Sequence, residues 1–265
     1  MNEPTQQVPL SHTEFAARLR AEGERRYHHQ HPFHRLMHDG RLTRRQLQQW
    51  VLNRYYYQTR IPIKDALILA KSEDPAFRRI WIHRIHDHDG THADDGGLAL
   101  WQRLARGVGL DEEEVRSLKS VLPGVRAACD GYVEFVRESS LVEAVASSLT
   151  ELFAPDLMSA RLAAWERHYP WINPAALEYF RTRVVRAAHD SDEALSFVSS
   201  QAVTYETQTR CIAALIRKTE ILWRLLDSVH AAFVTGTLEE CYDNGTAQPS
   251  YIDPESATPV RSDFR

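Results

Sequence analysis

Apolar residues recur every three or four positions along most of the chain, which is the spacing that buries one face of an α-helix. In the run after Thr43, for example, Leu47, Trp50 and Val51 would share a helix face. Capping boxes or cap–proline pairs, which mark helix starts, stand at Ser11–Glu14, Thr43–Gln46, Asp74–Pro75, Ser140–Glu143 and Asn173–Pro174. The pattern therefore predicts a succession of helices.

Strand signals are absent from the sequence: no long segment alternates apolar and polar residues, and no glycine occurs between Gly131 and Gly236. The expected helices cover residues 11–22, 43–60, 62–71, 75–88, 91–107, 111–119, 123–138, 141–153, 156–168, 174–187, 191–202 and 204–235. The break after residue 60 reflects Pro62, which removes a backbone donor and would kink or restart a helix. This series predicts an all-α fold, a compact helical bundle that encloses a cavity.

The helical periodicity ends at Gly236. The residues after it include three prolines and few side chains that could join a core. We therefore expect a single all-α domain over residues 1–236 and a flexible C-terminal tail over residues 237–265.

The charge balance argues against some classes of protein. The chain has 32 Lys and Arg against 36 Asp and Glu, whereas general nucleic-acid binding needs a basic surface. No apolar run approaches the about 18 residues of a membrane helix, and the N-terminus shows no secretory signal. The three cysteines form no CxxC pair, which suits a reducing compartment. We expect a cytoplasmic protein with no membrane or nucleic-acid partner.

The stretch RIHDHDGTHADDGG, residues 84–97, has the composition of a metal site or a proton-handling site. His88 and His92 stand four residues apart, which is ligand spacing for zinc or iron on a helix. However, the Glu-x-x-His motifs of a di-iron bundle are absent, and zinc would need a third ligand that we cannot place. Alternatively, the aspartates are caps and solvated charges, while Arg84 and His88 share an inward face. These residues alone leave both interpretations open.

Cationic and aromatic residues within the predicted helices form a second group of candidates. Arg54, Tyr57 and Gln58 would share one helix face, with Lys64 following Pro62; the alternative is a solvated surface. This face would be cationic, aromatic and hydrogen-bonding at once, so it is a candidate pocket wall.

Other cations lie in apolar helical runs, among them Arg161 and Lys218, and Tyr179 shares a face with Arg183. A buried Lys218 would need an anionic partner, which a bound anionic substrate could supply. The alternative for each cation is an exposed head group on a packed stem. In YHHQHPFH, residues 27–34, His28 and His31 could likewise share a face or be half-exposed at a helix end. Motifs of nucleotide binding and of serine hydrolases are absent from the sequence.

Six strings, in matching order, resemble the pyrroloquinoline-quinone synthase family: YHHQHPFH, WVLNRYYYQTRIPIKDA, RIHDHDGTHADDGG, LPGVRAACDGY, SSLTELFAP and HYPWI. The similarity extends from about Tyr27 to Phe233. It implies a haem-oxygenase-like, TenA-like α-helical fold without haem, and usually a homodimer.

The resemblance also implies an oxidoreductase that catalyses the last step of pyrroloquinoline quinone biosynthesis. A bicyclic, amino-bearing tricarboxylate would undergo ring closure and an eight-electron oxidation, with dioxygen as oxidant and release of hydrogen peroxide. The family uses no metal and no organic cofactor. The histidine–aspartate cluster would then handle protons instead of holding a metal.

The family's site residues correspond to positions of this sequence. By resemblance, His88 is the central acid–base residue and His28 a second active-site histidine. Tyr179 and Arg183 would line, with His88, the position of dioxygen and then of peroxide. The substrate-contacting positions are Arg54, Gln58, Lys64, Arg84, Tyr132, Thr150, Glu151, Arg161 and Lys218, to which the helix-face argument adds Tyr57. Some members have a histidine where this chain has Met158, so a third proton-handling histidine is missing here.

Two other functions stay open beside this one. A metal-dependent oxygenase of the same fold would use His88 and His92 as ligands. A non-catalytic carrier would bind the quinone without consuming oxygen.

Overall fold

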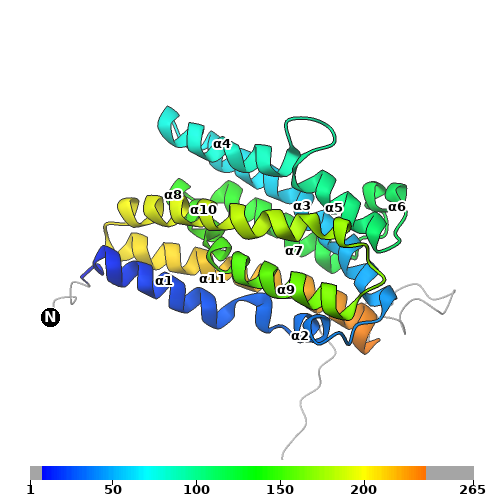
Figure 1. The fold of residues 1–265 in the computed structure, drawn as a ribbon. Coiled ribbons are helices and arrows are strands. Elements are labelled where there is room, and N and C mark those ends of the chain that lie inside the picture. The colour runs from blue at the N-terminus through cyan, green and yellow to red at the C-terminus, as the bar shows by residue number, and fades with distance from the viewer. Residues whose placement is uncertain (1–7, 237–265) are drawn as a thin grey trace, which may run out of the picture.

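The computed structural model describes residues 8–236, apart from the side chains of residues 186–190, and within that range it contains helices and no strand. The long helices are α1 (His12–Arg26), α3 (Arg44–Ala70), α4 (Pro75–Asp89), α5 (Gly96–Gly107), α7 (Pro123–Glu138), α9 (Ala154–His168), α10 (Glu178–Gln201) and α11 (Tyr205–His230). The shorter segments are α2 (Pro32–His38), α6 (Glu112–Ser117), α8 (Leu141–Ser147), the 3-10 turns η1 (His28–Gln30), η2 (Ser148–Phe153) and η3 (Pro174–Leu177), and the π-helical turn η4 (Ala231–Thr235). Figure 1 shows these helices gathered into one bundle, so the predicted all-α bundle is confirmed.

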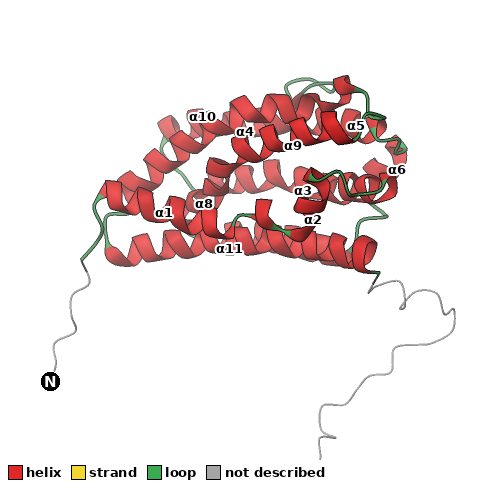
Figure 2. Cartoon of the chain, turned by 60° about the horizontal axis from the view of Figure 1, so that its bottom comes forward, coloured by secondary structure: helices red, strands yellow, loops and turns green. Residues whose placement is uncertain are grey.

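Helix α3 lies at the centre of the bundle and packs against α4, α5 and α7. Its apolar residues Leu47 and Trp50 are buried, and so are its polar residues Arg54 and Gln58. On the other side, α11 packs along α1, α7 and α8, and Figure 2 shows α1 beside α11. Because every residue from Trp50 to Gln58 is buried, α3 carries polar side chains into the interior of the bundle.

The predicted helix starts at the three capping boxes are confirmed. Ser11, Thr43 and Ser140 each accept a hydrogen bond from the backbone N–H three residues later, and the Glu or Gln at that position bonds back to the cap. The cap–proline pairs also mark starts, since Asp74 accepts from the N–H of Ala76 and Asn173 from that of Ala175. Local side-chain chemistry therefore sets these boundaries.

The predicted break at Pro62 is wrong, because α3 continues through this residue to Ala70. A proline inside a helix costs about 3 kcal/mol. Ile61 and Pro62 are themselves buried, as are Lys64, Asp65 and Ile68 on the following turns, and this burial offsets the cost.

The predicted helix over residues 91–107 begins late, at Gly96. Helix α4 ends at Gly90, which has φ 82°, a conformation that favours glycine. The Asp95 carboxylate then accepts hydrogen bonds from the backbone N–H groups of Thr91 and His92, at 2.8 and 2.9 Å. A side chain that bonds to nearby backbone donors competes with helix formation, so residues 91–95 form a loop.

Other boundaries shift as well. The predicted helix over 141–153 divides into α8 and η2, while those over 174–187 and 191–202 merge into η3 and the continuous α10, which contains no glycine or proline. The prediction missed η1 and α2. The predicted flexible tail over 237–265 lies outside the described residues, and so does the far side of the predicted domain boundary at 236. Among the described helices, none is both long and apolar enough to cross a membrane.

Candidate functional site

The predicted site residues converge on one region of the bundle interior. They are His28 of η1; Arg54, Tyr57, Gln58 and Lys64 of α3; Arg84 and His88 of α4; Tyr132 of α7; Thr150 and Glu151 of η2; Arg161 of α9; Tyr179 and Arg183 of α10; and Lys218 of α11. All are buried except Glu151, whose side chain is 17% exposed. The alternative that the helical cations are exposed at the surface is therefore wrong.

The face predicted on α3 is confirmed by its contacts. The guanidinium carbon of Arg54 lies 3.9 Å from the ring centroid of Tyr57, and the Tyr57 hydroxyl accepts a hydrogen bond from Nζ of Lys218 at 2.9 Å. Gln58 Oε1 accepts a hydrogen bond from the hydroxyl of Tyr179 at 3.0 Å. One helix face thus meets both α10 and α11.

The surroundings of His88 leave one of its ring nitrogens able to accept a proton, as a general base requires. Its Nδ1 lies 3.2 Å from the carbonyl oxygen of Arg84, one helical turn earlier. A carbonyl can only accept, so Nδ1 carries the ring proton of the neutral imidazole and Nε2 has the lone pair. Nε2 is buried and has no hydrogen-bond partner in the described part of the chain. Burial, followed by the charge of Arg183, lowers the pKa of His88 to about 3, so its imidazole is neutral near pH 7.

Tyr179 and Arg183 stand one turn apart on α10 and are both buried, as their spacing predicts. The charge of Arg183 contributes to lowering the pKa values of both His88 and Glu151. A cation beside a neutral base can stabilise negative charge that forms next to that base.

Lys64 and Arg84 have carboxylate partners. Lys64 Nζ lies 2.6 Å from Asp65 Oδ1 and also donates to the Ser148 hydroxyl at 2.9 Å. Arg84 forms an ion pair with Glu151. Burial alone would raise the pKa of Glu151, but Arg84, Lys64 and Arg183 outweigh it and lower the pKa to about 2.

Three of the buried cations, Arg54, Arg161 and Lys218, form no ion pair with a carboxylate in the described part of the chain. Burial and the charges of Lys64 and Arg54 lower the pKa of Lys218 well below its usual 10.5. Lys218 Nζ lies 3.2 Å from the ring centroid of Tyr132. Burial and Arg54 likewise lower the pKa of Arg161 to about 9. Cations in such a setting need an anion.

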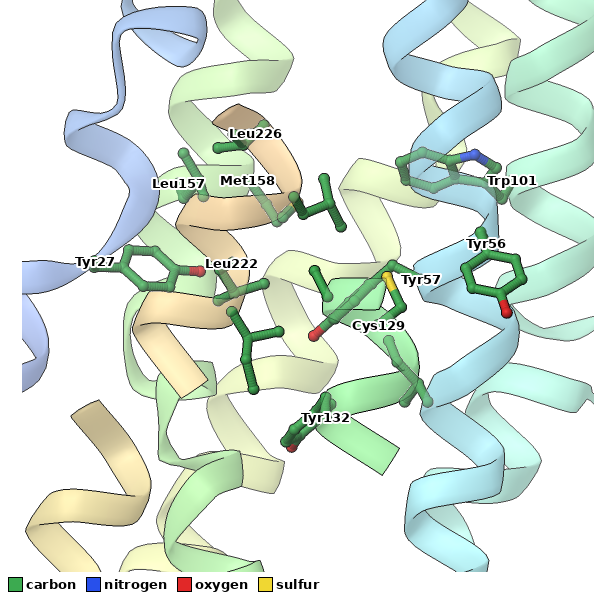
Figure 3. Close-up of a cluster of buried hydrophobic side chains, with 14 of the residues drawn as sticks. Tyr27, Tyr56, Tyr57, Trp101, Cys129, Tyr132, Leu157, Met158, Leu222 and Leu226 are labelled. Atoms are coloured by element: carbon green, nitrogen blue, oxygen red, sulfur yellow. The ribbon is translucent and has the colours of Figure 1, made fainter. Parts of the chain in front are cut away.

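Tyrosines form part of the wall around these cations. Figure 3 shows the hydroxyls of Tyr27, just before η1, and of Tyr57, on α3, directed toward the same part of the interior, with Tyr132 nearby. Tyr132 and Ser147 lie within hydrogen-bond distance, with their hydroxyl oxygens 3.3 Å apart. The wall therefore combines aromatic faces with hydroxyl groups. That this region encloses a substrate cavity stays a prediction.

The histidines of residues 28–34 are buried, so the alternative of half-exposed histidines is wrong for His28, His31 and His34. Burial and the charge of Arg54 lower the pKa of His28 well below 6.5. His31 is the N-cap of α2, and its Nε2 lies 3.0 Å from Asp227 on α11. His28 and His31 therefore have different surroundings instead of a common face.

The histidine–aspartate cluster does not present His88 and His92 together. His88 is buried on α4, whereas His92 is exposed in the loop after that helix has ended. Among the described residues, no group of three or more His, Cys, Asp or Glu side chains could hold a metal ion. The interpretation in which Arg84 and His88 share an inward face is confirmed.

Three residues beside the site were missed by sequence reasoning: His34, Asp65 and Trp81. Trp81 places its ring centroid 4.1 Å from the Arg84 guanidinium and donates its indole N–H to Asp65 at 3.1 Å. Asp65 in turn pairs with Lys64. Trp81 lies one turn before the interior residues 84 and 88, and this helical spacing could have identified it from the sequence. Nothing in the sequence connects Trp81 to Asp65.

A small groove opens beside this region. It has a volume of about 270 Å³ and is lined by Tyr27, His38, Phe153 and Leu157, among others. Tyr27 packs its ring 4.3 Å from that of His28, so the groove lies next to the predicted site.

Relatives with known names are similar to the whole helical region. The pyrroloquinoline-quinone synthase of Xanthomonas euvesicatoria is 52% identical over 226 residues, which cover 85% of this chain and 90% of that protein. That of Xanthomonas campestris is 48% identical over 256 residues, 97% of each. That of Pseudomonas syringae pv. syringae is 50% identical over 224 residues, 84% of this chain and 89% of the relative.

Solved structures with little sequence identity have the same architecture. A domain of unknown function with a heme oxygenase-like fold from Shewanella denitrificans superposes with a TM-score of 0.69 at 16% identity, covering 86% of this chain and 96% of that one. A TenA homologue from Pseudomonas syringae pv. tomato gives 0.67 at 13% identity, with coverage of 86% and 99%. The model of the TENA/THI-4/PQQC family matches residues 16–228. The chain therefore belongs to the TENA/THI-4/PQQC family and has a heme oxygenase-like fold.

Proposed function

We propose that this protein is a pyrroloquinoline-quinone synthase that closes and oxidises a bicyclic tricarboxylate precursor. Dioxygen accepts the electrons, hydrogen peroxide is released, and neither a metal nor an organic cofactor takes part. The names of relatives about 50% identical over most of the chain support the activity. The chemistry of the buried site supports the substrate class.

The observation that carries the proposal is the set of six cationic side chains buried in the bundle interior: Arg54, Lys64, Arg84, Arg161, Arg183 and Lys218. Three of them, Arg54, Arg161 and Lys218, form no ion pair with a carboxylate in the described part of the chain, whereas Lys64 and Arg84 pair with Asp65 and Glu151. Desolvated cations are costly without anions, and arginine forks bind carboxylates through two parallel hydrogen bonds. A substrate with several carboxylates is therefore the complementary ligand.

The neutral His88 suits proton removal from this substrate. Its Nε2 lone pair is buried and faces no protein donor among the described residues, so it can accept a proton from carbon or nitrogen of a bound ring. Bound carboxylates would also oppose the positive charges that lower its pKa, which makes the imidazole a stronger base in the complex.

Arg183 and Tyr179 would act on the oxygen species. Triplet dioxygen reacts with singlet organic molecules one electron at a time, and a deprotonated, electron-rich ring can supply those electrons. The Arg183 charge near His88 would then stabilise superoxide-like charge, and the Tyr179 hydroxyl would position the oxygen beside the ring.

We further propose that the protein is a cytoplasmic homodimer, as the resemblance implies. Light scattering coupled to size-exclusion chromatography tests the assembly. A single species of twice the chain mass is the expected result, and a monomer of 30.5 kDa would contradict it.

The activity is tested by mixing chelator-treated protein with the precursor in air while following oxygen uptake and quinone absorbance. We expect both signals without added metal. The matched variants are His88→Asn, which should lose them, and His86→Asn, an exposed histidine on the same helix, which should keep them. Quinone binding without oxygen uptake would indicate a carrier, and turnover only after iron is restored would indicate a metal-dependent oxygenase.

A further inference from the structure

His34 links three elements of the site without being one of its predicted residues. It lies on α2, is 1% exposed, and its ring centroid is 4.9 Å from that of His28. Its Nδ1 lies 2.9 Å from the backbone carbonyl oxygen of His28, and its Nε2 lies 3.1 Å from Nη2 of Arg161. One imidazole therefore connects η1, α2 and α9.

The direction of both hydrogen bonds follows from the partners. The carbonyl of His28 can only accept, so His34 donates from Nδ1. Arg161 can only donate, so His34 Nε2 accepts from it. This arrangement requires the neutral tautomer with its proton on Nδ1, and a protonated ring would lose the contact to the guanidinium.

Arg161 depends on this contact for its orientation. It has no carboxylate partner in the described part of the chain; its Nε is buried without a hydrogen bond, and its Nη1 lies 3.8 Å from the weak acceptor Met158 Sδ. The Trp50 ring, 5.0 Å from the guanidinium carbon, limits movement on one side. His34 is the one strong acceptor for this guanidinium among the described residues, and Nε and Nη1 stay available to a ligand.

We propose that His34 is a positioning residue that fixes the Arg161 guanidinium so that its remaining N–H groups bind a substrate carboxylate. The inference rests on the proposed function, because it assigns one carboxylate of the tricarboxylate ligand to Arg161. His34 touches no substrate atom and acts through Arg161.

Two substitutions separate the two hydrogen bonds of His34. Glutamine places its Oε1 near the position of Nε2 and can still accept from Arg161, whereas asparagine places its NH₂ group near Nδ1 and can only keep the bond to His28. The control is His29→Asn, an exposed histidine of the same segment. Affinity is measured by calorimetric titration with pyrroloquinoline quinone, and folding by thermal unfolding.

We expect His34→Asn to weaken the affinity at least about tenfold, as loss of a hydrogen bond to a charged group does. His34→Gln and His29→Asn should stay within about threefold of the wild type, because the Arg161 contact survives in both. In an Arg161→Ala background, His34→Asn should not weaken the affinity further, because His34 acts through that guanidinium. A packing role alone would produce neither the difference between Gln and Asn nor this coupling.

Equal losses in both variants, no loss in either, or additive effects with Arg161→Ala would overturn the role of His34 alone. Failure of the wild type to bind the quinone would overturn the proposed function together with it. Should His34→Asn not fold, His34→Ala with added imidazole replaces it. Affinity restored by imidazole supports the proposal, and affinity indifferent to imidazole overturns it.

Discussion

Substitution of Lys218 by methionine should weaken ligand binding but stabilise the unliganded protein. The ammonium group is buried, donates one hydrogen bond to Tyr57 and lies against the ring of Tyr132, with no carboxylate in ion-pair distance among the described residues. Replacing a buried charge with an apolar side chain of similar shape is often neutral or stabilising by about 1–4 kcal/mol. The lost contacts to the two tyrosines are together worth about 1–2 kcal/mol, so against a mid-range gain of about 2.5 kcal/mol we expect the unliganded protein to gain about 1 kcal/mol.

This gain should appear as a melting temperature about 2–4 °C higher, given the size of the domain. The affinity for pyrroloquinoline quinone should fall about 10- to 100-fold, because one charge-assisted hydrogen bond to a carboxylate is lost. Thermal unfolding and calorimetric titration measure the two effects, and Arg224→Met, an exposed cation on the same helix, is the matched control.

The effect of pH provides an internal check. Because the pKa of Lys218 is lowered in the folded protein, the unfolded chain holds this proton more tightly. The wild type should therefore become more stable as pH rises from that lowered pKa toward the usual 10.5, by up to about 1.4 kcal/mol per pH unit. Lys218→Met lacks this contribution, so its advantage shrinks with rising pH. A variant that is less stable by about 2 kcal/mol would show that the buried charge of Lys218 stabilises the free protein, and normal quinone binding would show that Lys218 does not bind the ligand; either result contradicts the prediction.

Three further predictions concern the same site. His88→Asn should bind the quinone normally but lose about 10²- to 10⁴-fold in kcat; wild-type rates would remove His88 from its role. Since its pKa is about 3 in the free protein, kcat/KM should not decline between about pH 7 and 5 through protonation of His88, and a decline with an apparent pKa near 6.5 would contradict this. Glu151 contributes stability above its usual pKa of 4.5 that is lost as pH falls toward 2; Glu151→Gln should remove about 2 kcal/mol near pH 7, and unchanged urea unfolding would count against this.

The sequence predicted helix starts well because the determinants are local. Ser11, Thr43 and Ser140 satisfy backbone donors within their own turn, so no tertiary contact is needed to find them. Pro62 shows the opposite case, where packing around the proline overrides its local preference. The loop over 91–95 depends on one carboxylate, that of Asp95, which the periodicity could not distinguish from a helical residue.

The site was predictable only in part. Helix spacing alone placed Arg54, Tyr57 and Gln58 together, and Arg84 with His88, but the burial of Arg161 or Lys218 depends on which helices pack against them. The resemblance supplied those positions. His34 was not predicted because its role depends on contacts with η1 and α9. In the sequence, 127 positions separate it from Arg161.

We infer that the buried cations Arg54, Arg161 and Lys218, which have no carboxylate partner in the described part of the chain, bind a polycarboxylate ligand. Burial, followed by nearby positive charges, lowers the pKa values of His88, His28 and Lys218. Calorimetric titration of the wild type with pyrroloquinoline quinone, in buffers of different ionisation enthalpy near pH 7, measures both binding and protons exchanged. We expect one quinone per chain with net proton uptake, because ligand carboxylates raise those pKa values. Absence of binding, or binding with net proton release, would contradict this inference.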